Sequence, residues 1–323
     1  MTAPLVLDAQ IHVWKASTPE RPWPADAIEP QRPEPLEVPE VRDVMARAGV
    51  SGALLLGPTW EGSRNDYVLA TAAADPSQFG AICRWATGDP AEVEKLADWR
   101  GIAGMRAIRM SLNRGDVAGT LSAARDSGFF AAAERYGVPL SIYAPGRYDL
   151  HRDLARAYPG LRIAVDHAAV ETADRPLTEA VAPLTQLAEY PGIAVKASAL
   201  PCFLDLRTEK PPYPSITEAV YRLVEAFGAD RVFFGSDLSR LPVPYADLVD
   251  VFIHHLPDLE SDEQALVRGR ALATWLGWTE PLAAGPETAA PESAGLKSSG
   301  PEPAEPETAD PESAESGTEA RRG

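Results

Sequence analysis

Three polar residues alternate with apolar ones near the start of the chain, in the segment Asp8-Ala-Gln-Ile-His-Val-Trp14. A carboxylate, an amide and an imidazole are poor core residues, because each must form hydrogen bonds when it is buried. Residues two apart on a strand point to the same side, so Asp8, Gln10 and His12 are expected to face one way. We interpret this segment as a strand end that contributes to a chemical site.

A repeated order of helix, glycine, apolar strand and polar loop predicts the elements that hold these residues. Strands are expected at 5–10, 49–56, 79–84, 101–109, 137–143, 160–165, 192–197 and 228–235, and amphipathic helices at 40–48, 91–99, 127–136, 217–227 and 262–276. The strand cores are apolar without alternation, as in Ala53-Leu-Leu-Leu56, which is typical of parallel strands covered on both faces. Eight such units predict an α/β fold of the (β/α)₈ TIM-barrel type. The alternative is a doubly wound sheet, but no Gly-x-Gly-x-x-Gly follows the first strand.

The composition of the chain limits the classes of binding partner and the cellular location that we expect. The formal net charge of −17 argues against nucleic acid and anionic membrane surfaces, which require cationic patches. No apolar run approaches the roughly 20 residues needed to span a bilayer. The two cysteines, Cys83 and Cys202, are far apart, and the N-terminus lacks a signal-peptide pattern, so we predict a cytoplasmic protein. The oligomeric state is left open, a homo-oligomer included.

The end of the chain has a different composition. Residues 279–323 contain ten acidic and three basic residues, and the pattern Pro-Glu-Thr-Ala-x-Pro-Glu-Ser-Ala occurs twice, at 286–294 and 306–314. With almost no large apolar side chains, this Pro/Glu/Ala-rich segment cannot offset the entropy of ordering itself. We predict a barrel over residues 1–278 and a disordered, low-complexity tail over 279–323.

Chemistry in such a barrel lies at the C-terminal ends of the strands. Polar residues at the expected strand ends are Asp8, Gln10, His12, Arg106, Arg109, Tyr143, Asp166, His167, Lys196, Ser198, Ser236 and Asp237. Their convergence on one barrel mouth is a better indication of a site than any single residue.

Four motifs resemble the TIM barrels of the amidohydrolase superfamily, in the amidohydrolase-related, lactonase-like branch. They are the first segment, Val165-Asp-His-Ala168, Ala194-Val-Lys-Ala-Ser198 and Ala226-Phe-Gly-Ala-Asp-Arg-Val-Phe-Phe-Gly-Ser-Asp237, and the last is the most specific. The resemblance covers about residues 5–278.

The resemblance also implies a set of metal ligands, which this chain only partly retains. The family's metal-dependent members use a His-x-His pair, a histidine on strand 5 or 6 and the strand-8 aspartate. Here Gln10 replaces the first histidine and Tyr143 stands where strand 5 would end in one. An amide is a weak ligand for zinc, so we favour a site without metal and expect no cofactor. The alternative is a divalent metal such as zinc held by His12, His167 and Asp237 with a water.

The catalytic roles follow from the residue types. We predict that Asp237 is the general base that activates water, and that His12 and His167 polarise a carbonyl. Gln10 is either a further hydrogen-bond donor to the substrate or a structural residue, and both readings stay open.

Further contacts to the substrate are expected from Arg106, Arg109, Tyr143 and Arg240. Arg106 and Arg109 are three positions apart and cannot point the same way on a regular strand; we prefer Arg106 as the fork for a substrate carboxylate. Tyr143 and Arg240 are equally compatible with substrate contact and with a position at the rim or in solvent. Lys196 is expected to form an ion pair inside the barrel.

The preferred hypothesis is a hydrolase that opens a lactone, a small-molecule substrate with an acidic group. A second hypothesis keeps the barrel but assigns decarboxylation, dehydration or cyclisation in a biosynthetic route. A third is an inactive binding protein.

Overall fold

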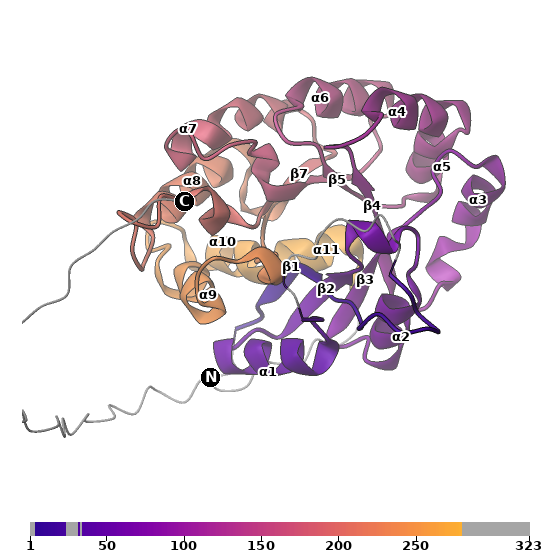
Figure 1. The fold of residues 1–323 in the computed structure, drawn as a ribbon. Coiled ribbons are helices and arrows are strands. Elements are labelled where there is room, and N and C mark those ends of the chain that lie inside the picture. The colour runs from indigo at the N-terminus through magenta and orange to yellow at the C-terminus, as the bar shows by residue number, and fades with distance from the viewer. Residues whose placement is uncertain (1–3, 24–31, 33, 280–323) are drawn as a thin grey trace, which may run out of the picture. The chain divides into compact units, whose positions relative to one another are not determined.

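The computed structural model describes residues 4–23, 32 and 34–279, and within them eight parallel strands form a nearly closed barrel (Figure 1). The strands are β1 (Leu7–His12), β2 (Gly52–Leu56), β3 (Phe79–Arg84), β4 (Met105–Ser111), β5 (Leu140–Tyr143), β6 (Ile163–Val165), β7 (Ile193–Ala197) and β8 (Val232–Phe234). They pair in sequence order. The backbone N–H of Asp237 donates to the carbonyl oxygen of Gln10 at 3.0 Å, which links the end of β8 to β1. The predicted TIM barrel is confirmed.

Helices surround the strands, as expected for a parallel barrel (Figure 1). The α-helices are α1 (Val38–Ala48), α2 (Asp66–Ala74), α3 (Pro90–Glu94), α4 (Val117–Asp126), α5 (Phe129–Tyr136), α6 (Tyr148–Ala157), α7 (Leu177–Val181), α8 (Pro214–Phe227), α9 (Tyr245–His254), α10 (Ser261–Ala265) and α11 (Ala271–Leu276). Short 3₁₀ segments are η1 (Thr59–Glu61), η2 (Lys95–Gly101), η3 (Asp166–Ala169), η4 (Ala182–Glu189), η5 (Leu200–Phe203), η6 (Ala229–Arg231) and η7 (Leu238–Arg240), and η8 (Leu266–Arg270) is π-helical.

The closing helix expected at 262–276 is interrupted by η8, and the interruption has a steric reason. A Cβ on Gly269 would lie 2.9 Å from the backbone nitrogen of Leu7 and 3.0 Å from its Cγ, so only glycine lets this segment approach β1. Beyond it, Leu272, Leu276 and Trp278 pack against buried residues from the strands, including Leu54 and Phe233. One end of the barrel is thereby filled with apolar side chains, and the polar strand ends lie at the other.

A register shift in β1 separates Asp8 from Gln10 and His12. Asp8 pairs with Ala53 but Ile11 with Leu55, so β1 contains one extra residue between them. The expectation that all three polar side chains face one way is wrong for Asp8, because a one-residue shift reverses the face.

Asp8 instead stabilises the end of β8. Its carboxylate accepts hydrogen bonds from the backbone N–H of Ser236 at 2.9 Å and from the hydroxyl of Tyr245 at 3.1 Å. Burial raises the pKa of Asp8 to about 6.

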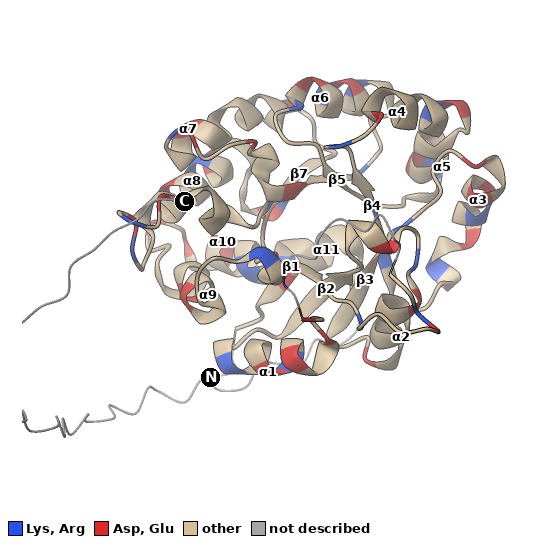
Figure 2. Ribbon diagram, in the orientation of Figure 1, with Lys and Arg blue, Asp and Glu red and all other residues tan. Residues whose placement is uncertain are grey.

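Charged residues of both signs lie along the surrounding helices, and some also lie inside the ring that the helices form (Figure 2). Among the described residues, no helix is long and apolar enough to cross a membrane. Apart from Thr279, the predicted tail over 279–323 lies outside the described residues. The cytoplasmic location stays a prediction, and the oligomeric state stays open.

Candidate active site

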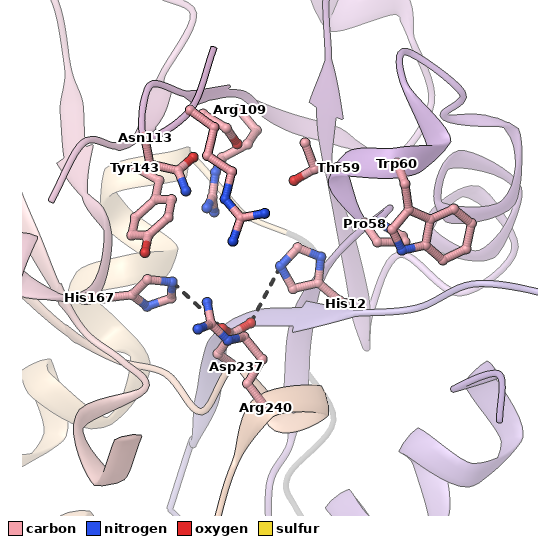
Figure 3. A pocket seen from close by; sticks show the side chains of 12 residues that line it. His12, Pro58, Thr59, Trp60, Arg109, Asn113, Tyr143, His167, Asp237 and Arg240 are labelled. Atoms are coloured by element: carbon pink, nitrogen blue, oxygen red, sulfur yellow. Dashed lines mark ion pairs between the residues drawn. The ribbon is translucent and has the colours of Figure 1, made fainter. Parts of the chain in front are cut away.

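A cavity of about 300 Å³ opens at the C-terminal ends of the strands (Figure 3). Its lining consists of His12, Pro58, Thr59, Trp60, Arg109, Ser111, Asn113, Arg114, Tyr143, His167, Asp237 and Arg240. The structure therefore brings together six of the predicted site residues from five strands or strand ends. Gln10 lies directly behind them, and Arg106 does not reach the cavity.

Asp237 lies between the two imidazoles (Figure 3). Its Oδ1 is 3.4 Å from Nε2 of His12, and its Oδ2 is 3.6 Å from Nε2 of His167. All three side chains are at least 95% buried. Asp237 and His167 also have positive φ angles, 55° and 53°, which are uncommon for residues other than glycine. Such backbone conformations directly after strands are typical of functional sites.

The protonation states follow from burial and from the neighbouring charges. Burial raises the pKa of Asp237, but the charged groups around it, which include Arg240 and Arg109, hold it below its usual value. Burial lowers the pKa of His12 to about 3 and also lowers the pKa of His167. At neutral pH the group is therefore an ionised carboxylate between two uncharged imidazoles.

Gln10 connects this group to two buried cations. Its Oε1 accepts hydrogen bonds from Arg109 at 2.8 Å and from Nζ of Lys196 at 3.1 Å. Because arginine and lysine can only donate, the amide orientation is determined, and the NH₂ group must face the other way. There, Nε2 lies 3.4 Å from Oδ1 of Asp237 and 3.4 Å from Nε2 of His167. Gln10 is fully buried and does not line the cavity, which supports the structural reading.

The amide also determines the tautomer of His167. Since Nε2 of His167 faces an NH₂ donor, it carries no hydrogen, and Nδ1 is the protonated nitrogen. Nδ1 lies 2.8 Å from the hydroxyl oxygen of Ser198 and donates to it. The unprotonated Nε2 lies 3.6 Å from Oδ2 of Asp237 and can accept a proton in place of the hydrogen bond from Gln10.

A second layer of charges supports the site from below. Asp166 is fully buried, forms an ion pair with Arg109, and lies 3.1 Å from Nζ of Lys196. The hydroxyl of Ser141 donates to Asp166 at 2.7 Å. Burial alone would raise the pKa of Asp166, but Arg109 and Lys196 lower it well below its usual value. The predicted ion pair of Lys196 is confirmed.

The two arginines of β4 have different surroundings. Arg109 lines the cavity, whereas the guanidinium of Arg106 lies 5.4 Å from the centre of the Trp278 ring, near the filled end of the barrel. The pairing of β3 with β4 shifts between Met105 and Ala107, so Arg106 occupies an irregular position. The sequence favoured Arg106 over Arg109 as the residue that binds a substrate carboxylate. The structure places Arg109, and not Arg106, at the cavity.

Tyr143 and Arg240 both line the cavity, which favours contact with the substrate over a position at the rim or in solvent. The Tyr143 ring packs edge-on against His167 with 5.2 Å between ring centres, and a hydrogen bond joins Tyr143 to Arg240. The pKa of Arg240 is raised, because the attraction of Asp237 and Tyr143 exceeds the cost of burial.

Several lining residues were missed in the sequence, although strand ends could have indicated some of them. β4 continues two residues beyond its expected end to Ser111, which lines the cavity. Trp60 lies on η1, after β2, and contacts Trp14 and Trp23 with ring centres 6.1 and 4.8 Å apart. No pattern in the sequence indicated that Trp60 would pack against Trp14 and Trp23.

The side chains at this site do not form the set of metal ligands that the family's metal-dependent members use. The NH₂ group of Gln10 points at Asp237 and His167, which are two of the three remaining ligands, and an NH₂ group cannot coordinate a cation. Turning the amide would direct its NH₂ group at Arg109 and Lys196, which cannot accept. Within residues 4–23, 32 and 34–279, no group of three His, Cys, Asp or Glu side chains is placed to hold a metal.

Comparisons with known proteins agree with this architecture. L-fucono-1,5-lactonase from Burkholderia ambifaria is 29% identical over 269 residues, which cover 75% of this chain and 83% of that protein. An amidohydrolase from Burkholderia multivorans crystallised with HEPES superposes with a TM-score of 0.69 at 18% identity, over 84% of this chain and 99% of the other. A probable 2-pyrone-4,6-dicarboxylic acid hydrolase from Acinetobacter baumannii with bound citric acid superposes with a TM-score of 0.67 at 15% identity, over the same shares. A family model described as amidohydrolase matches residues 7–288, and the chain therefore belongs to the amidohydrolase family.

Proposed function

We propose that this protein is a hydrolase that opens a lactone with water and without a tightly bound metal. One observation carries the proposal: a single ionised carboxylate, Asp237, lies between two uncharged imidazoles in a cavity lined by arginines. The similarity to a lactonase supports the choice of a cyclic ester as substrate.

In the proposed reaction, Asp237 takes a proton from water as the water oxygen attacks the lactone carbonyl. The bond between the carbonyl carbon and the ring oxygen then breaks, and the ring oxygen receives the proton. The net result is one lactone and one water converted to one hydroxy acid. Since the unprotonated Nε2 of His167 lies beside Asp237, it can hold the proton between these two steps.

The developing charge on the carbonyl oxygen needs donors that face the cavity. Both imidazole Nε2 atoms are directed at Asp237, which supports proton transfer more than direct polarisation of a carbonyl. Arg109, Tyr143 and Arg240 line the cavity and carry N–H or O–H groups, so we assign the stabilisation of the oxyanion to them.

The charge of the cavity supports a substrate with an acidic group. Arg109, Arg114 and Arg240 line it, against Asp237 as the one acidic lining residue among those described. The chain as a whole has a net charge of −17, so this cluster of cations is opposite in sign to the rest of the protein.

The test is hydrolysis of a panel of sugar lactones and acidic lactones in oxygen-18 water, after exhaustive dialysis against a chelator. We expect ring opening with one oxygen-18 atom in the new carboxylate, at an undiminished rate. Turnover without label would favour the decarboxylase, dehydratase or cyclase alternative. Loss of activity on chelation, with recovery on adding zinc, would contradict the metal-free part. Equal lactone turnover by Asp237→Asn would contradict the assigned base.

A further inference from the structure

A second cavity of about 240 Å³ adjoins the catalytic one. Thr59, Arg109 and Ser111 line both cavities, so the two are neighbours across these three side chains. Arg84, the last residue of β3, lines only the second cavity.

Arg84 is a cation whose contacts are all neutral. Its terminal nitrogens donate to the hydroxyl of Ser111 at 3.3 Å, the hydroxyl of Thr59 at 3.1 Å and the carbonyl oxygen of Gly57 at 3.4 Å. Within the described part of the chain, no carboxylate lies within ion-pair distance of Arg84. Burial, together with repulsion from Arg109, lowers the pKa of Arg84 to about 9.

The shortage of negative charge extends beneath the cavities. Arg109 and Lys196 both pair with Asp166, the carboxylate that also attracts Arg84 from a greater distance. Three cations therefore interact with Asp166, and Asp237 is the other carboxylate that attracts Arg109 and Lys196. A charge withdrawn from water is costly unless an opposite charge reaches it, so an added anion would be favourable here.

Two hydroxyls complete a set of donors at the boundary of the two cavities. The oxygens of Thr59 and Ser111 accept from Arg84, which leaves their own hydrogens available. Neither hydroxyl donates to another of the residues that the structure describes. An oxyanion at the boundary of the two cavities would accept hydrogen bonds from these two O–H groups and from the guanidinium of Arg109.

We propose that Thr59, Ser111, Arg84 and Arg109 form a binding site for a carboxylate, separate from the reacting group. The inference rests on the proposed function for the identity of the ligand: the carboxylate belongs to the acidic lactone. The carboxylate lies at the shared wall of the two cavities while the lactone carbonyl lies near Asp237. The substrate is therefore a lactone whose acid group is a separate substituent, not a product of ring opening.

Binding is tested first, without catalysis, on the full chain with glutarate as the probe. Titration calorimetry is done with wild type, Arg84→Met, Arg84→Lys and the control Arg125→Met, which removes an exposed arginine on α4. We expect glutarate to bind wild type and Arg125→Met equally, and Arg84→Met at least about 10-fold more weakly. Equal binding by Arg84→Met would overturn the proposal, as would tighter binding of inorganic phosphate than of glutarate by wild type.

Stability provides an independent readout. Because Arg84 has no opposite charge, Arg84→Met is expected to melt, without ligand, at or above the wild-type temperature. Glutarate should raise the melting temperature of wild type but not that of Arg84→Met. If Arg84→Met does not fold, Thr59→Val and Ser111→Ala replace it in the calorimetry, and unchanged glutarate binding by both would overturn the proposal.

Kinetics then separate this site from the proposed function. The substrates are an acidic lactone and its methyl ester, compared as kcat/KM ratios. We expect wild type to prefer the acid at least about 10-fold, and Arg84→Met to lose that preference through a higher KM for the acid, whereas the control Arg125→Met keeps it. Glutarate binding that depends on Arg84, without hydrolysis of any lactone, would refute the hydrolase and retain the anion site. Hydrolysis with no preference for the acid would refute the anion site and retain the hydrolase.

Discussion

Gln10→Glu is the most informative single substitution, because it changes one charge without changing the shape of the site. One oxygen of the introduced carboxylate would still accept from Arg109 and Lys196, which lie 2.8 and 3.1 Å from the present amide oxygen. The other oxygen would replace an NH₂ group that lies 3.4 Å from Oδ1 of Asp237. Two carboxylates would then face each other, and they cannot both ionise easily.

The size of the effect follows from this distance. Two charges 3.4 Å apart repel by about 5 kcal/mol at an effective dielectric constant of about 20. That energy corresponds to about 3.5 pKa units, and attraction from Arg109 and Lys196 offsets part of it, so we expect a rise of about 2 units. The added proton resides mainly on Asp237, because the introduced carboxylate would contact both cations.

The assay is the pH dependence of kcat/KM on an acidic lactone. Since the pKa of Asp237 is below the usual 3.8, wild-type activity should fall only below about pH 4. The variant should lose activity at a pH about 2 units higher than wild type does, and recover above it. Gln186→Glu, at an exposed position on η4, serves as the control for added charge. A variant profile that coincides with wild type would refute the contact between Gln10 and the catalytic base.

Three further predictions test other parts of the site and of the fold. Asp237→Asn should lower kcat by about 10² to 10⁴, the usual range for loss of a general base, with little change in KM, measured by steady-state kinetics. Ser198→Ala removes the partner of Nδ1 in His167 and leaves a buried N–H unpaired, so it should lower kcat by about 10-fold and also lower the melting temperature; unchanged kcat would contradict the assigned tautomer. His151 is fully buried on α6, and burial lowers its pKa to about 4 from the usual 6.5. Because the pKa of His151 is lower in the folded protein than in the unfolded chain, the free energy of unfolding decreases as the pH falls below 6.5. The decrease is about 2 kcal/mol at pH 5. His151→Leu should remove this loss, as measured by urea unfolding at pH 7.5 and pH 5.

Much of the barrel could be predicted from local patterns. Apolar strands such as 49–56, each preceded by a helix and a glycine, bury both faces wherever they occur, and that is a property of the segment itself. The same holds for the polar residues at strand ends, since parallel strands bring their C-terminal ends to one side. His12, His167, Asp237 and Tyr143 were located in this way, and the structure places all four at one cavity.

The errors arose where the regular alternation of a strand fails. The extra residue in β1 turns Asp8 away from Gln10 and His12, and the shift in β4 leaves Arg109, not Arg106, at the cavity. Each shift depends on how one strand pairs with its neighbour, and no residue pattern within the strand indicates it.

The sequence alone determined the fold class and the residue types at the strand ends, because burial and periodicity act over a few neighbouring residues. Only the tertiary structure decided what those residues contact. Gln10 is directed by cations 99 and 186 positions away, and Arg84 lacks an anion because Asp166 is already paired with Arg109 and Lys196. Electrostatic interactions depend on the distance between side chains in space. For residues on β1, β3, β4, β6 and β7, those distances are set only when the barrel closes.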